Sequence, residues 1–370
     1  FLMAIDPMSP ADEMLPNAEV ADRNQHADAF TIHREDGQTW ARWDDYVDRN
    51  SAASLYHKSA WLTLIRDVFG HEAHYLCAKS TSGEVLGILP VIRLNSRLFG
   101  DFMVSMPYVN YGGAVADSDD VATALMQRTA ELADEVGVGH IEFRDTQYRG
   151  DRYPVRTDKL VMELALPKTV EELWSSFDAK LRAQAKRATK EPIEVVIGGK
   201  ELLSGFYCVF ARNMRDLGTP VYGREFFQAV MDAFGASARI VVVNYHGIPV
   251  ATGLLLGYKG RIEIPWASSI REYNRYGVNM LLYWEAMQMA IREGYQVFDF
   301  GRSTQDSGTH RFKKQWGAQA RSLYWHYWVR PGCAMPNLTP HNPKYRLAIK
   351  LWQRMPLFAA NRIGPLLVKY

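Results

Sequence analysis

The chain has 370 residues, of which 47% are hydrophobic and 23% charged, a composition typical of a globular protein with room for two ordinary domains. The 43 Lys and Arg nearly balance 41 Asp and Glu, so the chain lacks the basic excess of a protein that wraps a long nucleic acid. Three cysteines, Cys77, Cys208 and Cys333, lie far apart without metal-ligand spacing, which excludes a disulfide framework and a zinc site and fits the cytoplasm. No window approaches the roughly 20 apolar residues of a membrane span.

The first half alternates helical and strand patterns after residues 1–27, which we take as a flexible N-terminal tail. Residues 101–113, with tyrosines set among small residues, are expected to form a loop. The expected helices span 57–69 and 121–136, and the expected strands span 71–80, 84–94, 140–146 and 159–166. This alternation is typical of an α/β fold.

A single long helix is predicted to connect the two halves. Residues 169–190 have helical periodicity, Thr169 and Glu172 form a capping box, and Pro192 lies just beyond the end. The second part of this helix carries Lys180, Arg182, Lys186, Arg187 and Lys190. These cations are interpreted either as a solvated helix face or as an electrostatic guide for the phosphates of coenzyme A, RNA or an anionic membrane.

The second half repeats the alternation, and each of its first two predicted helices ends in Gly, as a C-terminal cap would. The expected helices span 201–218, 223–235 and 278–293, and the expected strands span 193–197, 238–245, 249–258, 261–269, 296–300 and 320–329. The predicted order along the second half is therefore two helices, an antiparallel meander, a third helix and two strands.

This order of elements resembles a GNAT acyltransferase domain. In that family two neighbouring strands separate, unpaired groups of the first bind the pantetheine arm, and the next helix offers its free N–H groups to the pyrophosphate. The resemblance places the separated strand at 263–269 and the pyrophosphate turn at 271–279, where an ordinary helix entry is the alternative. The cofactor-binding residues that it implies are Trp266, Ser268, Arg275, Gly277, Asn279, Arg302 and Ser303.

A wider set of segments resembles the FemAB-related branch of the GNAT superfamily, in particular the subgroup associated with exosortase (PEP-CTERM) gene systems, and bacterial ceramide synthases more broadly. These segments are LGILPVIRLNSRLFG, SMPYVNYGG, MRDLGTPVYG, NMLLYWEAM and FDFGRSTQDSGTHRFKKQWGA. The resemblance runs from about Leu55 to the C-terminus and implies two tandem GNAT-like domains of mixed sheets flanked by helices, with an amphipathic helical tail. The expected divisions are 28–167 (N-terminal domain), 168–191 (connecting basic helix), 192–330 (C-terminal domain) and 331–370 (tail).

The active-site segment is expected at 298–318, where RFKKQWG matches a FemAB motif through Phe312, Lys313, Trp316 and Gly317. Amide formation needs an acceptor for the proton of the amine and donors for the oxyanion. The candidate catalytic residues are Asp299 and His310 for the proton and Lys313 for the oxyanion, with Arg302 and Ser303 also placed to hold the oxyanion or the leaving group. Alternatively, Asp299 pairs with a nearby cation and His310 only caps the helix that follows it. No metal is expected.

A second group of residues is expected to shape the acceptor pocket, because loops and helix ends commonly carry ligand contacts. The turn chemistry of Asn, Gly and Tyr is the alternative explanation. The candidate substrate residues are Tyr108, Asn110, Tyr111, Arg212 and Tyr222.

Taken together, these features predict an N-acyltransferase that moves a long-chain acyl group from acyl-CoA or acyl carrier protein to the amine of a sphingoid base or similar lipid. The alternative is an aminoacyl-tRNA-dependent FemAB-type transferase acting on an envelope or polysaccharide component, although the chain lacks the family's long helical arm that handles tRNA. A third interpretation is a non-catalytic binding module on a GNAT scaffold.

The tail is apolar with interspersed cations, and two interpretations of it stay open. It either packs on the domain as a terminal helix or makes a peripheral contact with an anionic membrane, on the inner face of the cytoplasmic membrane. Its interspersed cations are Arg346, Lys350, Arg354, Arg362 and Lys369.

Overall fold

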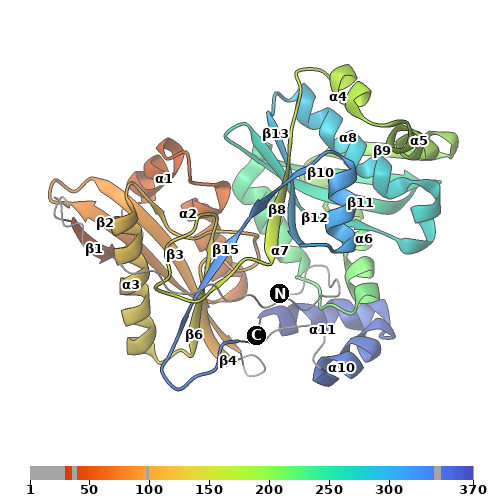
Figure 1. Ribbon diagram of the computed structural model, residues 1–370. Helices are drawn as coiled ribbons and strands as arrows, with labels where there is room; N and C mark the ends of the chain where they lie inside the picture. The colour runs from red at the N-terminus through yellow and green to blue at the C-terminus, as the bar shows by residue number, and fades with distance from the viewer. Residues whose placement is uncertain (1–29, 36–39, 97–99, 337–342, 370) are drawn as a thin grey trace.

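The computed structural model describes residues 30–35, 40–96, 100–336 and 343–369, so the expected N-terminal tail at 1–27 lies outside the described residues. Two mixed β-sheets lie side by side, each flanked by helices (Figure 1). The architecture is the expected α/β fold, with two mixed sheets flanked by helices and two helices at the C-terminal end of the described residues. No helix in the described part of the chain is long and apolar enough to cross a bilayer.

The predicted elements of the first half are present in the predicted order. The strands are β1 (Phe30–Arg34), β2 (Glu72–Ser80), β3 (Val85–Ser96), β4 (Gly100–Val104), β5 (Val115–Ala116), β6 (His140–Asp145), β7 (Val155–Arg156) and β8 (Lys159–Ala165). The helices are α1 (Trp40–Arg49), α2 (Ser59–Phe69), α3 (Asp119–Val136), α4 (Val170–Ser176) and α5 (Ala179–Arg187), with short 3₁₀ turns at Leu55–His57 and Ala188–Lys190. Five further elements, β1, α1, β4, β5 and β7, were not predicted.

The second half also follows the predicted order. The strands are β9 (Ile193–Gly198), β10 (Ala238–Tyr245), β11 (Ile248–Tyr258), β12 (Arg261–Ser269), β13 (Val297–Thr304), β14 (Gln319–Ser322) and β15 (Tyr324–Val329). The helices are α6 (Leu203–Leu217), α7 (Arg224–Phe234), α8 (Val278–Arg292), α9 (Gly308–Gln315), α10 (Pro343–Gln353) and α11 (Leu357–Lys369), with 3₁₀ turns at Lys200–Leu202, Gly235–Ser237 and Arg271–Tyr276.

The two sheets exchange strands. The first sheet has the order β1-β2-β3-β4-β6-β15-β7, with β5 on β3, and the second has the order β14-β8-β13-β12-β11-β10-β9. Strand β8 therefore leaves the first half to join the second sheet, and β15 returns from the second half to pair with β6 and β7. The boundaries expected at 167 and 330 thus do not coincide with the division between the sheets, and the domain limits stay a prediction.

One hydrophobic core is shared by the two halves. It includes Trp61 of α2 and Trp266 of β12. The Trp61 ring contacts Phe226 and Phe234, which lie near the two ends of α7. A second core covers the other face of the second sheet beneath α8, and a third lies between α3 and the first sheet. Because apolar side chains from both halves fill a single core, the two sheets are held in a fixed arrangement around the space between them.

Three local predictions were wrong. Residues 101–104 belong to strand β4, which pairs with β3 and β6, so the predicted loop begins later. The predicted helix at 169–190 breaks at Phe177, because the Asp178 carboxylate caps a new helix by accepting from the Leu181 N–H (2.6 Å). The predicted strand 320–329 is two strands in different sheets.

Candidate active site

Strands β12 and β13 separate at the middle of the second sheet, as expected. They pair in parallel from Arg261 with Val297 to Glu263 with Asp299. Beyond this point β12 continues beside β11 as far as Ser269, whereas β13 continues beside β8 as far as Thr304. The last pair before the separation therefore consists of two carboxylates, which share one face of the sheet because they are directly in register.

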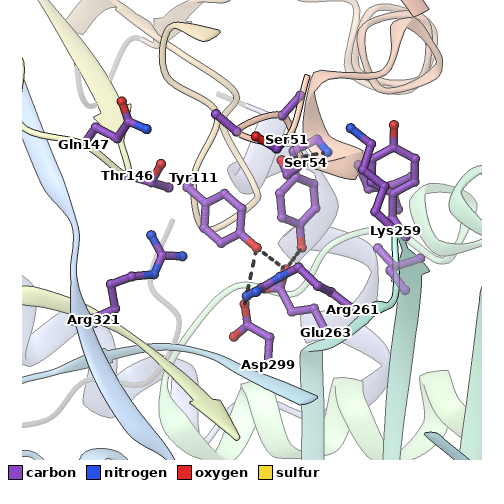
Figure 2. A pocket seen from close by; sticks show the side chains of 16 residues that line it. Ser51, Ser54, Tyr111, Thr146, Gln147, Lys259, Arg261, Glu263, Asp299 and Arg321 are labelled. Carbon is purple, nitrogen blue, oxygen red and sulfur yellow. Dashed lines mark hydrogen bonds and ion pairs between the residues drawn. The ribbon is translucent and has the colours of Figure 1, made fainter. Parts of the chain in front are cut away.

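Three side chains from the first half bind this carboxylate pair. The Tyr56 hydroxyl donates to Glu263 Oε2 (2.7 Å), and the Asn110 amide donates to Glu263 Oε1. The Tyr111 hydroxyl lies 3.3 Å from both Glu263 Oε2 and Asp299 Oδ2, so it bridges the two acids (Figure 2). A hydroxyl that can donate to either acid and accept from a protonated one offers a route for moving a proton between them.

The pair is arranged to hold a proton at neutral pH. Glu263 is 6% exposed and Asp299 is 1% exposed. Burial and the neighbouring Asp299 raise the pKa of Glu263 to about 8. Burial and the charge of Glu163 raise the pKa of Asp299 to about 6, against the opposing effect of the Gly301 N–H, which donates to Asp299 Oδ1 (2.7 Å). At pH 7 the pair therefore carries one proton and one negative charge.

Both acids line a cavity of about 440 Å³ between the two halves. This volume is in the range of small-molecule sites. Figure 2 shows Arg321, Thr146 and Gln147 across the cavity from Lys259. The remaining lining residues are Ser51, Ala52, Ala53, Ser54, Leu55, Tyr56, Tyr111, Leu256, Tyr258 and Arg261.

Two arginines add positive charge to the wall of this cavity. Arg261 Nη2 and Arg321 Nη2 both contact Glu163 Oε1, at 2.6 and 2.7 Å. Arg261 Nη2 also lies 3.8 Å from Asp299 Oδ2. Because two guanidinium groups share one carboxylate, this wall retains net positive charge beside the acid pair.

Lys313 lies buried beside the acid pair. Its ammonium group donates to the carbonyls of Gly301 (3.0 Å) and Arg302 (2.8 Å), where β13 has an irregular register and Gly301 has a φ of 73°. Burial lowers the pKa of Lys313 to about 8, whereas the charges of Asp299 and Glu263 act in the opposite direction. Lys313 thus fixes the backbone next to Asp299 and supplies a cation near both acids.

The structure brings some of the predicted site residues together and separates others. Asn110, Tyr111, Asp299 and Lys313 all belong to the cluster around the separating strands. His310 instead contacts the turn before α9, where its Nδ1 accepts from the Asp306 N–H (3.0 Å). His310 lies inside α9 rather than before it, and Ser307 caps the helix by accepting from the His310 N–H (3.1 Å), so the capping alternative is wrong as stated; the catalytic role of His310 stays a prediction.

The other predicted acceptor residues lie away from the acid pair. Tyr108 is buried against Phe69 and meets Tyr222 edge to face, so both rings belong to the shared core. Arg212 forms an ion pair with Glu272 (2.8 Å) on the surface. These three residues are not among those that line the cavity.

The predicted cofactor residues divide between the core and the entry of α8. Trp266 packs against Phe226 and Phe227, and Ser268 Oγ accepts from Asn213 (3.0 Å). These contacts hold both side chains within the protein, and their role in binding a cofactor stays a prediction.

The turn before α8 fits phosphate better. Gly277 has a φ of 81°, and a Cβ there would lie 3.3 Å from Arg187 Cβ, so the end of the basic helix α5 packs closely on this turn. Arg187 Nη1 lies 3.4 Å from the Arg275 carbonyl, and half-buried Asn279 opens the first turn of α8. Free N–H groups and two arginines therefore meet at one helix start.

Arg302 and Ser303 follow the separation of the strands. Arg302 lies over the Trp325 ring (4.8 Å), and burial together with the nearby Arg144 lowers its pKa to about 10. Within the described residues, the buried Ser303 Oγ has no hydrogen-bond partner. Ser303 is 3% exposed and does not line the cavity, so its part in binding a cofactor stays a prediction.

Sequence reasoning missed the central acid. Glu263 begins the EIPWASS segment, yet it is absent from the predicted site residues. A single acid between Ile262 and Ile264 in an apolar strand is itself a signal of a buried carboxylate. Tyr56 and Arg261 were also missed, and neither has a local motif. Tyr56 lies 207 residues from its partner, so only the fold reveals the contact.

Comparisons with known proteins agree with this geometry. Residues 175–314 match the family model described as an acetyltransferase (GNAT) domain. The matched segment is similar to a GNAT domain and covers 140 of the 370 residues. This match supports an enzyme that transfers acyl or aminoacyl groups. No curated protein matches the chain.

Solved structures share the fold of the whole chain. The crystal structure of FemX has a TM-score of 0.61 at 16% identity, covering 84% of this chain and 98% of that one. A tandem GNAT protein from the clavulanic acid biosynthesis pathway has a TM-score of 0.53 at 10% identity, covering 84% and 100%. The C-terminal domain of a putative lysylphosphatidylglycerol synthetase from Agrobacterium fabrum has a TM-score of 0.53 at 14% identity, covering 80% and 93%. The fold over most of the chain is thus similar to that of FemX and of a tandem GNAT protein.

Proposed function

We propose that the protein forms an amide by transferring an acyl or aminoacyl group to a primary amine, and that the Glu263 and Asp299 pair removes the proton from that amine. The observation that carries this proposal is the position of the pair. It lies where β12 and β13 separate and it also lines the cavity between the halves. Donor and acceptor can therefore meet at the acids from opposite sides.

The reaction requires an ammonium group to lose one proton before or during attack. Its nitrogen then bonds to the acyl carbon, the bond from that carbon to the thioester sulfur or the ester oxygen of the donor breaks, and the leaving group takes up the second proton that the nitrogen gives up. Asp299 accepts the first proton, and Tyr111 relays it to Glu263 once Glu263 is ionised, so both acids take part in the transfer. A base with a pKa near the working pH is effective, because it both accepts and returns the proton.

Lys313 acts on this reaction through position and charge. It holds the carbonyls of Gly301 and Arg302, and the Gly301 N–H in turn orients Asp299. Its positive charge favours the ionised form of Asp299. Direct contact between Lys313 and the oxyanion, as in the FemAB motif, stays part of the proposal.

For the donor we favour a long-chain acyl-CoA, with acyl carrier protein as a variant of the same thioester chemistry. The support is the entry of α8, where Arg275, Gly277 and Asn279 lie beside Arg187. These residues would bind the pyrophosphate, and the separated strands with Ser303 would accept the pantetheine arm. When bound, the thioester supplies the activated acyl carbon.

For the acceptor we propose an amine on a polar head group, such as that of a sphingoid base. The cavity offers hydroxyl and amide groups in Ser51, Thr146 and Gln147 as well as acids for the amine. The apolar side chains of Leu55 and Leu256 are available to the start of an alkyl chain.

The second candidate is aminoacyl transfer from charged tRNA to an envelope component. FemX and the lysylphosphatidylglycerol synthetase domain share the fold over nearly their whole length. The basic helix α5 would offer cations to RNA. The acid pair would perform the same deprotonation, because this reaction also joins an activated acyl carbon to an amine.

The two donors can be separated in one experiment. Purified full-length protein is incubated with palmitoyl-CoA or with a mixture of charged tRNAs, each with sphinganine, amino sugars and amino acids, and the products are followed by mass spectrometry. Glu263→Gln is the test variant, and Glu131→Gln, at a 50% exposed glutamate of α3, is the matched control. We expect amide from palmitoyl-CoA that Glu263→Gln loses and Glu131→Gln retains. Amide formed only from charged tRNA would replace the acyl-CoA proposal, and equal activity in Glu263→Gln would refute the role of the acid pair.

A further inference from the structure

The two C-terminal helices expose large apolar side chains to solvent. On α10, Leu347 and Leu351 are 66% and 61% exposed, and on α11, Phe358 is 78% exposed. Ile363, Leu366 and Leu367 of α11 are also exposed, as is Leu217 at the end of α6. We call this set the tail face. Isolated exposed leucines need no explanation, but six large exposed apolar side chains on two consecutive helices, with Leu217 on the helix that these two pack against, are more than scattered exposure and indicate a site of interaction.

The exposed residues are not those that attach the helices to the protein. Trp352 and Ala360 are buried, and Ile349 contacts Gly218 at the end of α6. Arg215 donates to the Met355 carbonyl (3.1 Å), and Gln353 donates to the Asp216 carbonyl (3.1 Å). Figure 1 shows both helices beneath α6 at one end of the molecule. The helices are therefore held by one side and leave the tail face unpartnered among the described residues.

Positive charge is concentrated in the same segment. Residues 331–370 contain six Lys or Arg and no Asp or Glu, whereas residues 1–330 contain 37 Lys or Arg and 41 Asp or Glu. Lys350 and Arg354 are exposed beside Leu347 and Leu351, and Arg362 is exposed one turn from Phe358. Helices that combine apolar side chains with Lys and Arg lie in the interface of a bilayer, where anionic lipid head groups attract the cations.

We infer that the tail face binds the surface of an anionic lipid bilayer. The apolar side chains would enter the boundary between head groups and acyl chains, and the cations would contact lipid phosphates. A second copy of the chain fits less well, because pairing two tail faces would bring the cations of both copies together without any acid from the tail to balance them. The inference stands independently of the proposed reaction.

The test is cosedimentation of the full-length protein with vesicles of pure phosphatidylcholine and with vesicles of equal parts phosphatidylcholine and phosphatidylglycerol. Two double variants, called the tail variants, are compared with the wild type. One carries Leu351→Glu and Phe358→Glu, and the other carries Lys350→Glu and Arg354→Glu. Ile248→Glu is the matched control, since Ile248 is 57% exposed in the β10–β11 hairpin. Thermal unfolding and circular dichroism of every variant verify that it is folded.

We expect binding to the anionic vesicles that weakens with salt, falls by at least about tenfold in both tail variants and persists in Ile248→Glu. Equal binding to both vesicle types, absence of binding, or unchanged binding by the folded tail variants would overturn the inference. The alternative result is a dimer of the wild type, detected by light scattering, that is lost in the variant carrying Leu351→Glu and Phe358→Glu. That result would assign the tail face to a second copy of the chain. Transfer to a short, water-soluble amine should be unchanged in the tail variants, so failure of membrane binding and failure of the proposed function are distinguishable.

Discussion

Replacement of Glu263 by Gln preserves the shape of the side chain but removes the proton that the folded protein holds at this position. The oxygen of Gln can still accept from Asn110, and its amide can donate to the Tyr56 oxygen, so the hydrogen bonds around residue 263 can be kept. The substitution therefore reports mainly on ionisation.

The sign of the effect follows from the raised pKa of Glu263. Below the ordinary glutamate pKa of 4.5 the group is protonated in both folded and unfolded chains. Between that value and about 8, the folded protein keeps a proton that the unfolded chain has released. The free energy of unfolding then falls as pH rises, by up to about 1.4 kcal/mol for each pH unit. Gln has no such dependence.

From pH 5.5 to pH 7.5, Glu263→Gln should therefore gain about 3 kcal/mol of stability relative to the wild type. With an unfolding entropy of about 2.1 cal/mol/K for each of 370 residues, this is about 4 °C in Tm. Thermal and urea unfolding at both pH values measure the gain, and Glu131→Gln should show none of it. A loss of stability that is the same at both pH values would mean that folded Glu263 is ionised, and the reasoning would fail.

Three further substitutions test the neighbours of the acid pair. Lys313→Met should lower kcat by about 10²-fold and shift the acidic limb of the pH–rate profile upward, because the cation that favours ionised Asp299 is lost; a lower kcat with an unshifted profile would make Lys313 purely structural. Tyr111→Phe should lower kcat by about tenfold with KM nearly unchanged, since the bridge between the acids is removed, and unchanged kinetics would exclude a relay. His310→Ala should leave kcat within about twofold and lower Tm by about 1 °C, whereas a large loss of kcat would restore His310 to a catalytic role.

Much of the second sheet was predictable because its signals are local. The meander from 238 to 269 has tight turns between apolar strands, and Gly218 ends α6 in the left-handed conformation that only a residue without Cβ adopts readily. Asp299 was predictable as well, because alternation in a strand directs it away from the buried Phe298 and Phe300.

The exchange of β8 and β15 between the sheets was not predictable, since a strand's sequence pattern shows that one face is buried but not which sheet buries it. The completed site was equally inaccessible. The pKa of Glu263 is raised because the fold buries it beside Asp299, against the opposing effect of the hydrogen bonds from Tyr56 and Asn110 of the other half of the chain. Residues such as Tyr108 were chosen for being aromatic in a loop, yet packing against Phe69 placed this ring in the core.

The most direct test of the central claim is the pH dependence of kcat/KM for amide formation by the wild type and by Glu263→Gln, with whichever donor is active. The account predicts a wild-type rate that rises between about pH 6 and pH 8, following the two acids. It also predicts a loss of about 10²- to 10⁴-fold in Glu263→Gln together with loss of the upper inflection. A Glu263→Gln enzyme with the wild-type rate and the same profile would show that the proton of the amine leaves by another route.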